Sequence, residues 1–272
     1  MPRPKRIEYE NALYHVMNRG RDRHTIFHDE SYYAAFLETL SEVYQRFNCI
    51  IHAYCLMGNH YHILLETPDA NLSRIMRHIN GVYTQRYNRL KKTDGPLFRG
   101  RFKAILVDQD AYLLQLSRYI HRNPIDMKKP MISDLSEYPW SSYPAYINKA
   151  KTPEWLFTKQ TYQVLGHKQR FKGYRNYVSQ GTDEETLRFY NRGNNASIVA
   201  DDDFREWVFN DLLPELESEG KAVVIQPVLP IESVVEGVSH YYKTNIENLR
   251  VVVRGPTKGN EARKIAMYLY IL

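Results

Sequence analysis

The chain has 272 residues and is 43% hydrophobic, enough for one large or two ordinary domains with a real core. Its formal net charge is +6, and no run approaches the about eighteen apolar residues of a membrane span. No signal peptide is evident, and the two cysteines, Cys49 and Cys55, are typical of reduced core thiols. These features exclude a membrane protein, and we expect a cytosolic, nucleoid-associated one.

Strands and helices alternate over the first 130 residues. Strands are expected at 13–18, 49–56, 60–66 and 98–107, and helices at 29–47, 71–93 and 108–123. The last helix should stop before Pro124, because the residue before a proline disfavours helical geometry. The order β-α-β-β-α-β-α predicts an α+β domain, with an antiparallel sheet and helices packed on it.

The rest of the chain divides into three segments. Residues 131–182 are a tyrosine-rich extension that we expect to pack on the domain formed by residues 1–130. Residues 183–227 are acidic and predict a linker or a helical segment, and residues 228–272 predict a smaller helical domain.

Positive charge is concentrated in the first half of the chain. Residues 1–150 contain 21 Lys and Arg against 15 Asp and Glu, whereas residues 151–272 contain 16 of each. Residues 74–103 hold nine basic residues against one acidic residue, interleaved with Tyr83, Tyr87, Phe98 and Phe102. Cations that neutralise phosphates and rings that stack on bases are typical of a groove for single-stranded nucleic acid. We favour this interpretation over a plain solvated face.

His60 and His62 are two residues apart in the third predicted strand. A strand places such residues on the same face, so the two imidazoles point the same way. Two neutral imidazoles can hold one divalent metal and leave coordination positions open, as a catalytic metal requires. The alternative is a pair of half-exposed strand histidines without a metal.

Tyr119 and Asn123 are four residues apart in the third predicted helix. They project from one face, offset from the apolar stripe, so a phenol and a carboxamide oxygen can reach the same metal-bound phosphate. Ionising a free tyrosine at pH 7 costs roughly 4 kcal/mol, which a divalent ion on the phosphate would offset. The alternative is an ordinary tyrosine that covers the core.

These stretches resemble a known family. Residues 56–65, which contain His60-Tyr61-His62, resemble the HUH signature of single-tyrosine transposases, and residues 118–124 resemble their nucleophile helix. Residues 95–102 and 138–143 resemble the subgroup called REP-associated tyrosine transposases, so that the resemblance covers roughly residues 8–180. One departure is Gly58, where the family commonly has proline.

The resemblance implies an HUH, ferredoxin-like fold and a metal-dependent endonuclease and strand transferase. Such enzymes recognise hairpins in single-stranded DNA from palindromic extragenic repeats, and they leave a 5′-phosphotyrosine and a free 3′-hydroxyl. Tyr119 is then the nucleophile, His60 and His62 are metal ligands, and Asn123 is the third ligand. We expect Mg²⁺ or Mn²⁺, with zinc as an alternative. The subgroup implies a monomer acting in cis, with a dimer as the alternative.

Residues 228–272 resemble the DNA-binding domain of the bacterial replication initiator, through residues 241–243 and 262–269. This implies a helix-turn-helix for duplex DNA, the alternative being a small helical bundle without DNA contacts. We predict DNA contacts for eleven basic residues of the chain: Arg74, Arg77, Arg86, Arg99, Arg101, Lys103, Arg118, Arg122, Lys258, Arg263 and Lys264.

Two other functions stay open. The first is a DNA-binding regulator whose nuclease site is vestigial, which would use the same basic groove. A Tyr119→Phe change distinguishes this regulator from a nuclease, because only a nuclease would lose DNA cleavage and covalent attachment. The second is a metal hydrolase of small molecules, which predicts a closed apolar pocket instead of an open basic groove.

Overall fold

The computed structural model describes residues 6–191, 198–218 and 231–245. Contacts divide the chain into two compact units, residues 6–222 and a unit formed by residues 1–5 and 223–272. In the second unit, the described part contains the helix α10 (Ile231–Tyr241). The predictions for Lys258, Arg263 and Lys264 lie outside the described residues. None of the helices described here is both long and apolar enough to cross a membrane.

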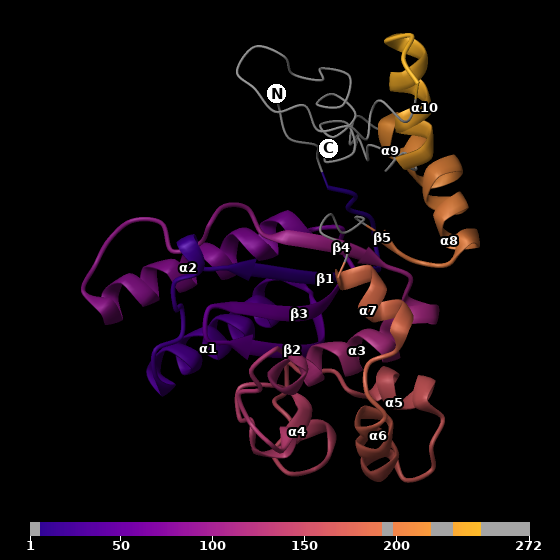
Figure 1. Ribbon diagram of the computed structural model, residues 1–272. Coiled ribbons are helices and arrows are strands. Elements are labelled where there is room, and N and C mark those ends of the chain that lie inside the picture. Colours follow the sequence, from indigo (N-terminus) through magenta and orange to yellow (C-terminus); the bar gives the residue numbers. More distant parts are fainter. Residues whose placement is uncertain (1–5, 192–197, 219–230, 246–272) are drawn as a thin grey trace. The chain divides into compact units, whose positions relative to one another are not determined.

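The first 130 residues follow the predicted order of elements (Figure 1). They are β1 (Ala12–Arg19), α1 (Glu30–Phe47), β2 (Ile50–Met57), β3 (His60–Thr67), α2 (Leu72–Lys91), β4 (Lys103–Val107) and α3 (Gln109–Asp126), with a short η1 (Arg21–Arg23) after β1. The later elements of this unit are η2 (Leu135–Glu137), α4 (Tyr143–Tyr146), α5 (Lys159–Leu165), α6 (Arg170–Ser179), α7 (Glu184–Asn191), β5 (Ile198–Val199), α8 (Asp202–Trp207), η3 (Val208–Leu212) and α9 (Leu213–Ser218).

The sheet has five strands in the order β2-β3-β1-β4-β5. The first four are antiparallel, and β5 runs parallel to β4. The predicted fold class, α+β with helices packed on the sheet, is confirmed. The four predicted strands are antiparallel, and the short β5, which was not predicted, makes the sheet mixed. A strand of two residues has no alternation that a sequence pattern can detect. The described residues of the acidic segment contribute this strand and the helices α7, α8 and α9.

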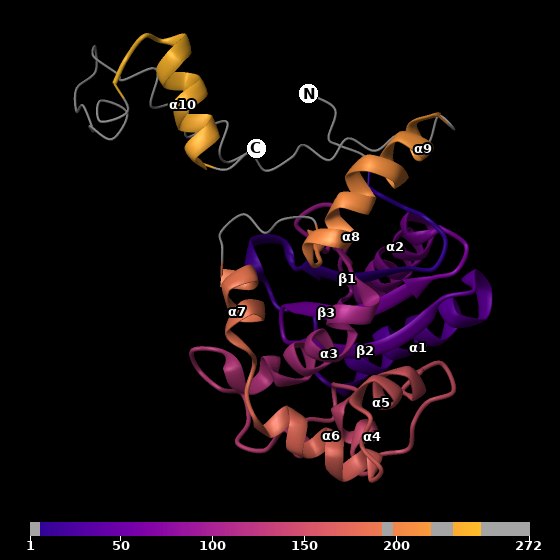
Figure 2. The ribbon, with the colours of Figure 1, turned by 90° about the vertical axis from the view of Figure 1, so that its right-hand side faces the viewer.

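Helices cover both faces of the sheet (Figure 2). On the face of α1 and α2, the ring of Phe36 lies 4.8 Å from that of Tyr61. On the other face, Leu116 and Ile120 of α3 share a buried cluster with Leu64 of β3. Residues of one strand alternate between the faces, so the even-numbered residues of β3, which include its histidines, face α3.

The helix α3 continues past the proline at which it was predicted to stop. Pro124 lies in its last turn and cannot donate a hydrogen bond to the carbonyl of Ile120. The side-chain amide of Asn123 donates to the carbonyl of Tyr119 at 2.9 Å and also reaches that of Ile120 at 3.5 Å. A side chain thus partly replaces the lost backbone bond, and the helix extends to Asp126.

The extension after α3 runs along the outer edge of β2. The backbone N–H of Leu56 donates to the carbonyl of Trp140 at 2.8 Å, and that of Phe157 donates to Ile51 at 2.8 Å. The hydroxyl of Tyr138 donates to the carbonyl of Leu56 at 2.6 Å. These contacts protect an edge strand that would otherwise be open. They give the stretch 138–143 a structural role.

A buried hydrogen-bond network joins α3 to this extension. The ring of His121 is fully buried, with Nδ1 2.7 Å from the hydroxyl of Tyr174 and Nε2 2.6 Å from Oγ of Ser142. The hydroxyl of Tyr174 in turn donates to Oγ of Ser117 at 2.9 Å. Burial lowers the pKa of His121 to about 3, so this ring is neutral at pH 7.

We expect His121 to make the fold less stable in mild acid. The unfolded chain protonates this ring near pH 6.5, whereas the folded protein does so only near pH 3, so the unfolded state binds more protons in this window. The stabilisation is therefore complete above pH 6.5 and decreases by about 1 kcal/mol for each pH unit below it. Urea unfolding of the wild type and a His121→Gln variant at pH 7.5 and 5.0 measures this loss. An equal loss in the two proteins would contradict the assignment.

Candidate active site

The two histidines of β3 lie side by side on the sheet face that α3 covers. Their ring centroids are 5.1 Å apart, and in the antiparallel register Met17 of β1 is opposite His62 while Arg19 is opposite His60. The side chain of His62 is buried, and that of His60 is half-buried. The sheet therefore presents two imidazoles to the helix that carries Tyr119.

Hydrogen bonds assign the proton of His60. Its Nδ1 lies 2.7 Å from Oδ1 of Asn59. The amide nitrogen of Asn59 donates to the carbonyl of Arg23 at 3.1 Å, which fixes the orientation of this carboxamide. Because Oδ1 only accepts, Nδ1 of His60 carries the proton and Nε2 keeps the lone pair that a metal needs.

A third histidine, which the sequence analysis did not single out, lies beside His62. His15 of β1 is fully buried, and its Nε2 lies 2.9 Å from Nδ1 of His62. The two rings are stacked with centroids 5.1 Å apart. On its other side, Nδ1 of His15 is hydrogen-bonded to the hydroxyl of Tyr190 from α7. Only the pairing of β1 with β3 brings His15 here, and a sequence pattern does not give that pairing.

Tyr119 lies close to this cluster. Its ring centroid is 6.2 Å from that of His62 and 6.0 Å from that of His15, and the ring stacks on Tyr190 at 4.1 Å. In the described part of the chain, the Tyr119 hydroxyl has no hydrogen-bond partner. Burial and the carboxylate of Asp126 raise the pKa of Tyr119 to about 12, so ionising it at pH 7 costs roughly 7 kcal/mol.

The imidazoles are neutral at physiological pH. Burial, with a smaller effect from the charge of Arg19, lowers the pKa of His60 to about 4. Burial and then its neighbours His60, His15 and Arg19 hold the pKa of His62 well below its usual range. Burial and the charge of Lys103 lower the pKa of His15 to about 3. The neutral ring is the form that binds a metal.

The donor set fits a divalent metal ion. Among the described residues, no three His, Cys, Asp or Glu side chains are placed to hold a metal. A carboxamide is outside that set, however, and Asn123 uses its amide nitrogen within α3 and keeps Oδ1 as an acceptor. Asn123 makes no hydrogen bond to His60 or His62 in the described structure. Two imidazoles and one carboxamide oxygen with open positions suit Mn²⁺, Mg²⁺ or zinc.

Comparison with protein families adds a decisive observation. Residues 8–123 match the family described as "Transposase IS200 like". Residues 8–123 are therefore an IS200-like transposase domain. The matched region includes both strand histidines, Tyr119 and Asn123, and it confirms the prediction of a DNA transposase. It does not extend to residues 228–272, so the resemblance of that segment to the replication initiator stays a prediction.

Solved structures also resemble the chain. A REP-associated tyrosine transposase bound to a REP hairpin is 16% identical, with a TM-score of 0.47, over 56% of this chain and 89% of that one. A proposed transposase from Deinococcus radiodurans R1 is 19% identical, with a TM-score of 0.32, over 45% of this chain and 97% of that one. No curated protein matches.

Exposed arginines border the His60 end of the transposase domain. The backbone N–H of Arg99 donates to the carbonyl of Arg19 at 3.0 Å, and that of Gly20 donates to Asn59 at 2.9 Å. Two loops that are distant in sequence thus meet beside the turn that precedes His60. We call the exposed arginines on them the basic rim: Arg19, Arg21, Arg23, Arg99 and Arg101.

Arg19 is the member of the basic rim opposite His60, and the sequence analysis missed it. Its side chain is exposed and forms no ion pair with any described residue. It lies outside the basic run at 74–103, and only the strand register brings it to the histidines. Lys103, which the sequence analysis did select, begins β4 opposite Met17 and on the same face.

The other basic residues predicted to bind DNA are dispersed. Arg74 and Arg77 are exposed on α2, which covers the sheet face away from Tyr119. The run at 74–103 is therefore divided between α2 and the loop at 99–101.

Three of the selected arginines pair with carboxylates in the described structure. Arg86 pairs with Glu42 at 2.6 Å, and Arg118 pairs with Asp183 at 2.7 Å. Arg122 pairs with Asp126, one helical turn further on, at 2.7 Å. Each of these three guanidinium groups thus has a carboxylate partner in the described structure.

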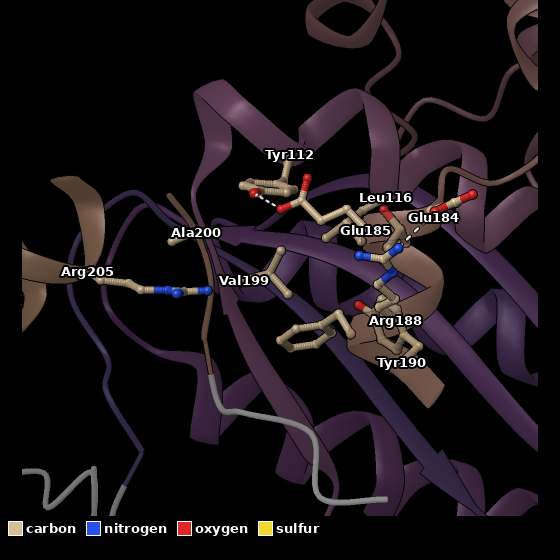
Figure 3. A pocket seen from close by; sticks show the side chains of 11 residues that line it. Tyr112, Leu116, Glu184, Glu185, Arg188, Tyr190, Val199, Ala200 and Arg205 are labelled. Atoms are coloured by element: carbon tan, nitrogen blue, oxygen red, sulfur yellow. Dashed lines mark hydrogen bonds and ion pairs between the residues drawn. The ribbon is translucent and has the colours of Figure 1, made fainter. Parts of the chain in front are cut away.

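A pocket of about 410 Å³ opens beside Tyr190 (Figure 3). The hydroxyl of Tyr112 donates to Glu185 at 2.5 Å, and Arg188 pairs with Glu184 at 3.0 Å at its wall. Neither His60 nor His62 lines this pocket.

Proposed function

We propose that the transposase domain is a metal-dependent endonuclease and strand transferase for single-stranded DNA, with Tyr119 as nucleophile, acting at REP-like hairpins. The main support is the distance of 6.2 Å between the rings of Tyr119 and His62 within one chain. That distance also favours a monomer acting in cis. The family match and the motifs at 95–102 and 138–143 support the choice of DNA.

The reaction begins when the hydroxyl oxygen of Tyr119 attacks the phosphorus of a phosphodiester. A bond forms between this oxygen and phosphorus, and the bond from phosphorus to the 3′-oxygen of the preceding nucleotide breaks. The phenol releases its proton to water, and the 3′-oxygen takes one from water. The products are a 5′-phosphotyrosine and a free 3′-hydroxyl, and attack by a 3′-hydroxyl reverses the step and joins strands.

A divalent ion held by His60, His62 and Asn123 would stabilise charge on the phosphate and orient it for in-line attack. The protein itself contributes two further effects. The stack on Tyr190 holds the ring of Tyr119 in place beside His62. The basic rim supplies the cations that a DNA backbone requires at the His60 end of the sheet.

The proposed DNA contacts are the exposed basic residues. Arg99, Arg101 and Lys103 would bind the backbone near the histidines, and Arg74 and Arg77 would bind more distant phosphates. Duplex DNA would be bound through Lys258, Arg263 and Lys264 of the C-terminal segment. Arg86, Arg118 and Arg122 would add to these contacts where DNA displaces their carboxylate partners.

Replacing Arg19 by alanine should reduce cleavage more than binding. A guanidinium beside the reacting phosphate stabilises charge that grows in the transition state, so we expect about a 100-fold lower single-turnover rate. Hairpin affinity should fall only a few-fold, because one phosphate contact among several is lost. Arg23→Ala is the matched control on the same rim. Equal losses of rate and affinity in the Arg19 variant would contradict a catalytic contact.

The test of the whole proposal is covalent attachment. The full chain is incubated with a labelled single-stranded hairpin and Mn²⁺, the products are separated on a denaturing gel, and the attached residue is mapped by mass spectrometry. We expect a DNA adduct on Tyr119. One observation favours a DNA-binding regulator instead, namely the ring of Tyr190 stacked on Tyr119. A protein that binds the hairpin and never becomes attached to it would establish that alternative.

A further inference from the structure

His62 can bind a metal only through a nitrogen without a proton. Its Nδ1 is engaged with Nε2 of His15 at 2.9 Å, which leaves Nε2 of His62 as the candidate donor. A neutral imidazole carries one proton, so the proton of His62 must be on Nδ1 if Nε2 is to bind metal. His60 already has this arrangement through Asn59.

The hydrogen bond between His62 and His15 permits two arrangements of protons. In the first, Nε2–H of His15 donates to Nδ1 of His62, and the proton of His62 then occupies the nitrogen that the metal needs. In the second, Nδ1–H of His62 donates to Nε2 of His15, and the Nε2 lone pair of His62 is free. Only the second arrangement agrees with a metal site.

Tyr190 can stabilise the second arrangement. With Nε2 of His15 accepting from His62, the proton of His15 is on Nδ1 and needs an acceptor, because the ring is fully buried. The hydroxyl oxygen of Tyr190 is in hydrogen-bond contact with that nitrogen. The hydroxyl can rotate its own proton away and accept.

We propose that His15 is a positioning residue that holds His62 in the tautomer and orientation of a metal ligand, with Tyr190 as the acceptor that completes the chain. The inference rests on the metal site of the proposed function. It explains why residue 15 is a histidine, since burial in the core does not by itself require an imidazole. It also links α7, which lies outside the region matched by the family, to the metal site.

The first experiment measures Mn²⁺ binding to the full chain without DNA, by electron paramagnetic resonance of free Mn²⁺. A His15→Leu variant keeps the bulk and removes the acceptor, so affinity should fall about 10- to 100-fold. A His15→Gln variant offers an acceptor and a donor in its amide, so we expect most of the affinity to return. Circular dichroism and thermal melting establish that each variant is folded.

A second variant tests the chain without touching either histidine. Tyr190→Phe keeps the ring stacked on Tyr119 and removes the acceptor for His15, so Mn²⁺ affinity should fall about tenfold. Tyr112→Phe is the matched control, because it also removes a hydrogen bond between α3 and α7, at Glu185. Its affinity for Mn²⁺ should equal that of the wild type.

The tautomers themselves are visible by ¹⁵N NMR of the histidine rings in the metal-free protein. We expect the proton of His62 on Nδ1 in the wild type, and a shift towards Nε2 in Tyr190→Phe. A wild-type proton on Nε2, unchanged affinity in His15→Leu, or equal losses in the Leu and Gln variants would each overturn the inference. A wild type that binds Mn²⁺ in the expected tautomer and never cleaves DNA would overturn the proposed nuclease alone.

Discussion

Replacing Tyr119 by phenylalanine should abolish cleavage and covalent attachment while hairpin binding stays as in the wild type. The change removes one oxygen, and in the described structure this oxygen has no hydrogen-bond partner that would be left unsatisfied. The ring keeps its stack on Tyr190, at 4.1 Å, so the fold around the site should not change. Without the nucleophile the rate should fall on the order of 10⁴-fold or more.

Single-turnover cleavage, a denaturing gel for the adduct and a binding titration with the same hairpin measure the three quantities. Tyr112→Phe is the control, since Tyr112 is on the same helix and also loses a hydroxyl. An adduct that persists in the Tyr119 variant would mean another nucleophile. Tyr190 would be the first candidate, because its ring stacks on that of Tyr119.

The local elements of the catalytic half were predictable because each has a complete local signal. The helix that begins at Glu30 is capped by Asp29, whose side chain accepts from the N–H of Ser31 at 2.9 Å. The positions of His60 and His62 in one strand and of Tyr119 in one helix follow from the same kind of periodicity. Local patterns thus identified the two elements that the proposed site requires.

The site residues that could not be predicted from the sequence depend on contacts between distant segments. His15 and Arg19 lie beside the histidines of β3 only because β1 pairs with β3. Tyr190 belongs to a helix and is 71 residues after Tyr119 in the chain. Charge counting has a related limit. A run of basic residues says nothing about which of them meet a carboxylate, as Arg86 and Arg118 do.

The end of α3 was also predicted wrongly, although the contacts that decide it are local. The rule that a helix ends before proline is sound on average, because proline removes a donor. In this chain Asn123 supplies a side-chain donor to the carbonyls of the preceding turn, and the helix continues. One side chain thus both extends the helix and keeps an oxygen for the proposed metal.

Replacing either histidine of β3 by alanine should remove metal-dependent cleavage, with different effects on stability. His60 is half-buried and bonded to Asn59, so His60→Ala should lower the cleavage rate on the order of 10³-fold and change the free energy of unfolding little. His62 is buried and bonded to His15, so His62→Ala leaves a buried imidazole unpaired and should also cost about 1–3 kcal/mol of stability.

Single-turnover cleavage at several Mn²⁺ concentrations and urea unfolding without metal separate the two effects. His24→Ala, an exposed histidine in the neighbouring loop, is the control and should cleave like the wild type. Full activity in both β3 variants would mean that the metal is bound elsewhere. If both variants lose cleavage to the same extent, the two histidines act together on the metal. If only His62→Ala also loses stability, His62 alone is part of the core, because His15 forms a hydrogen bond with it.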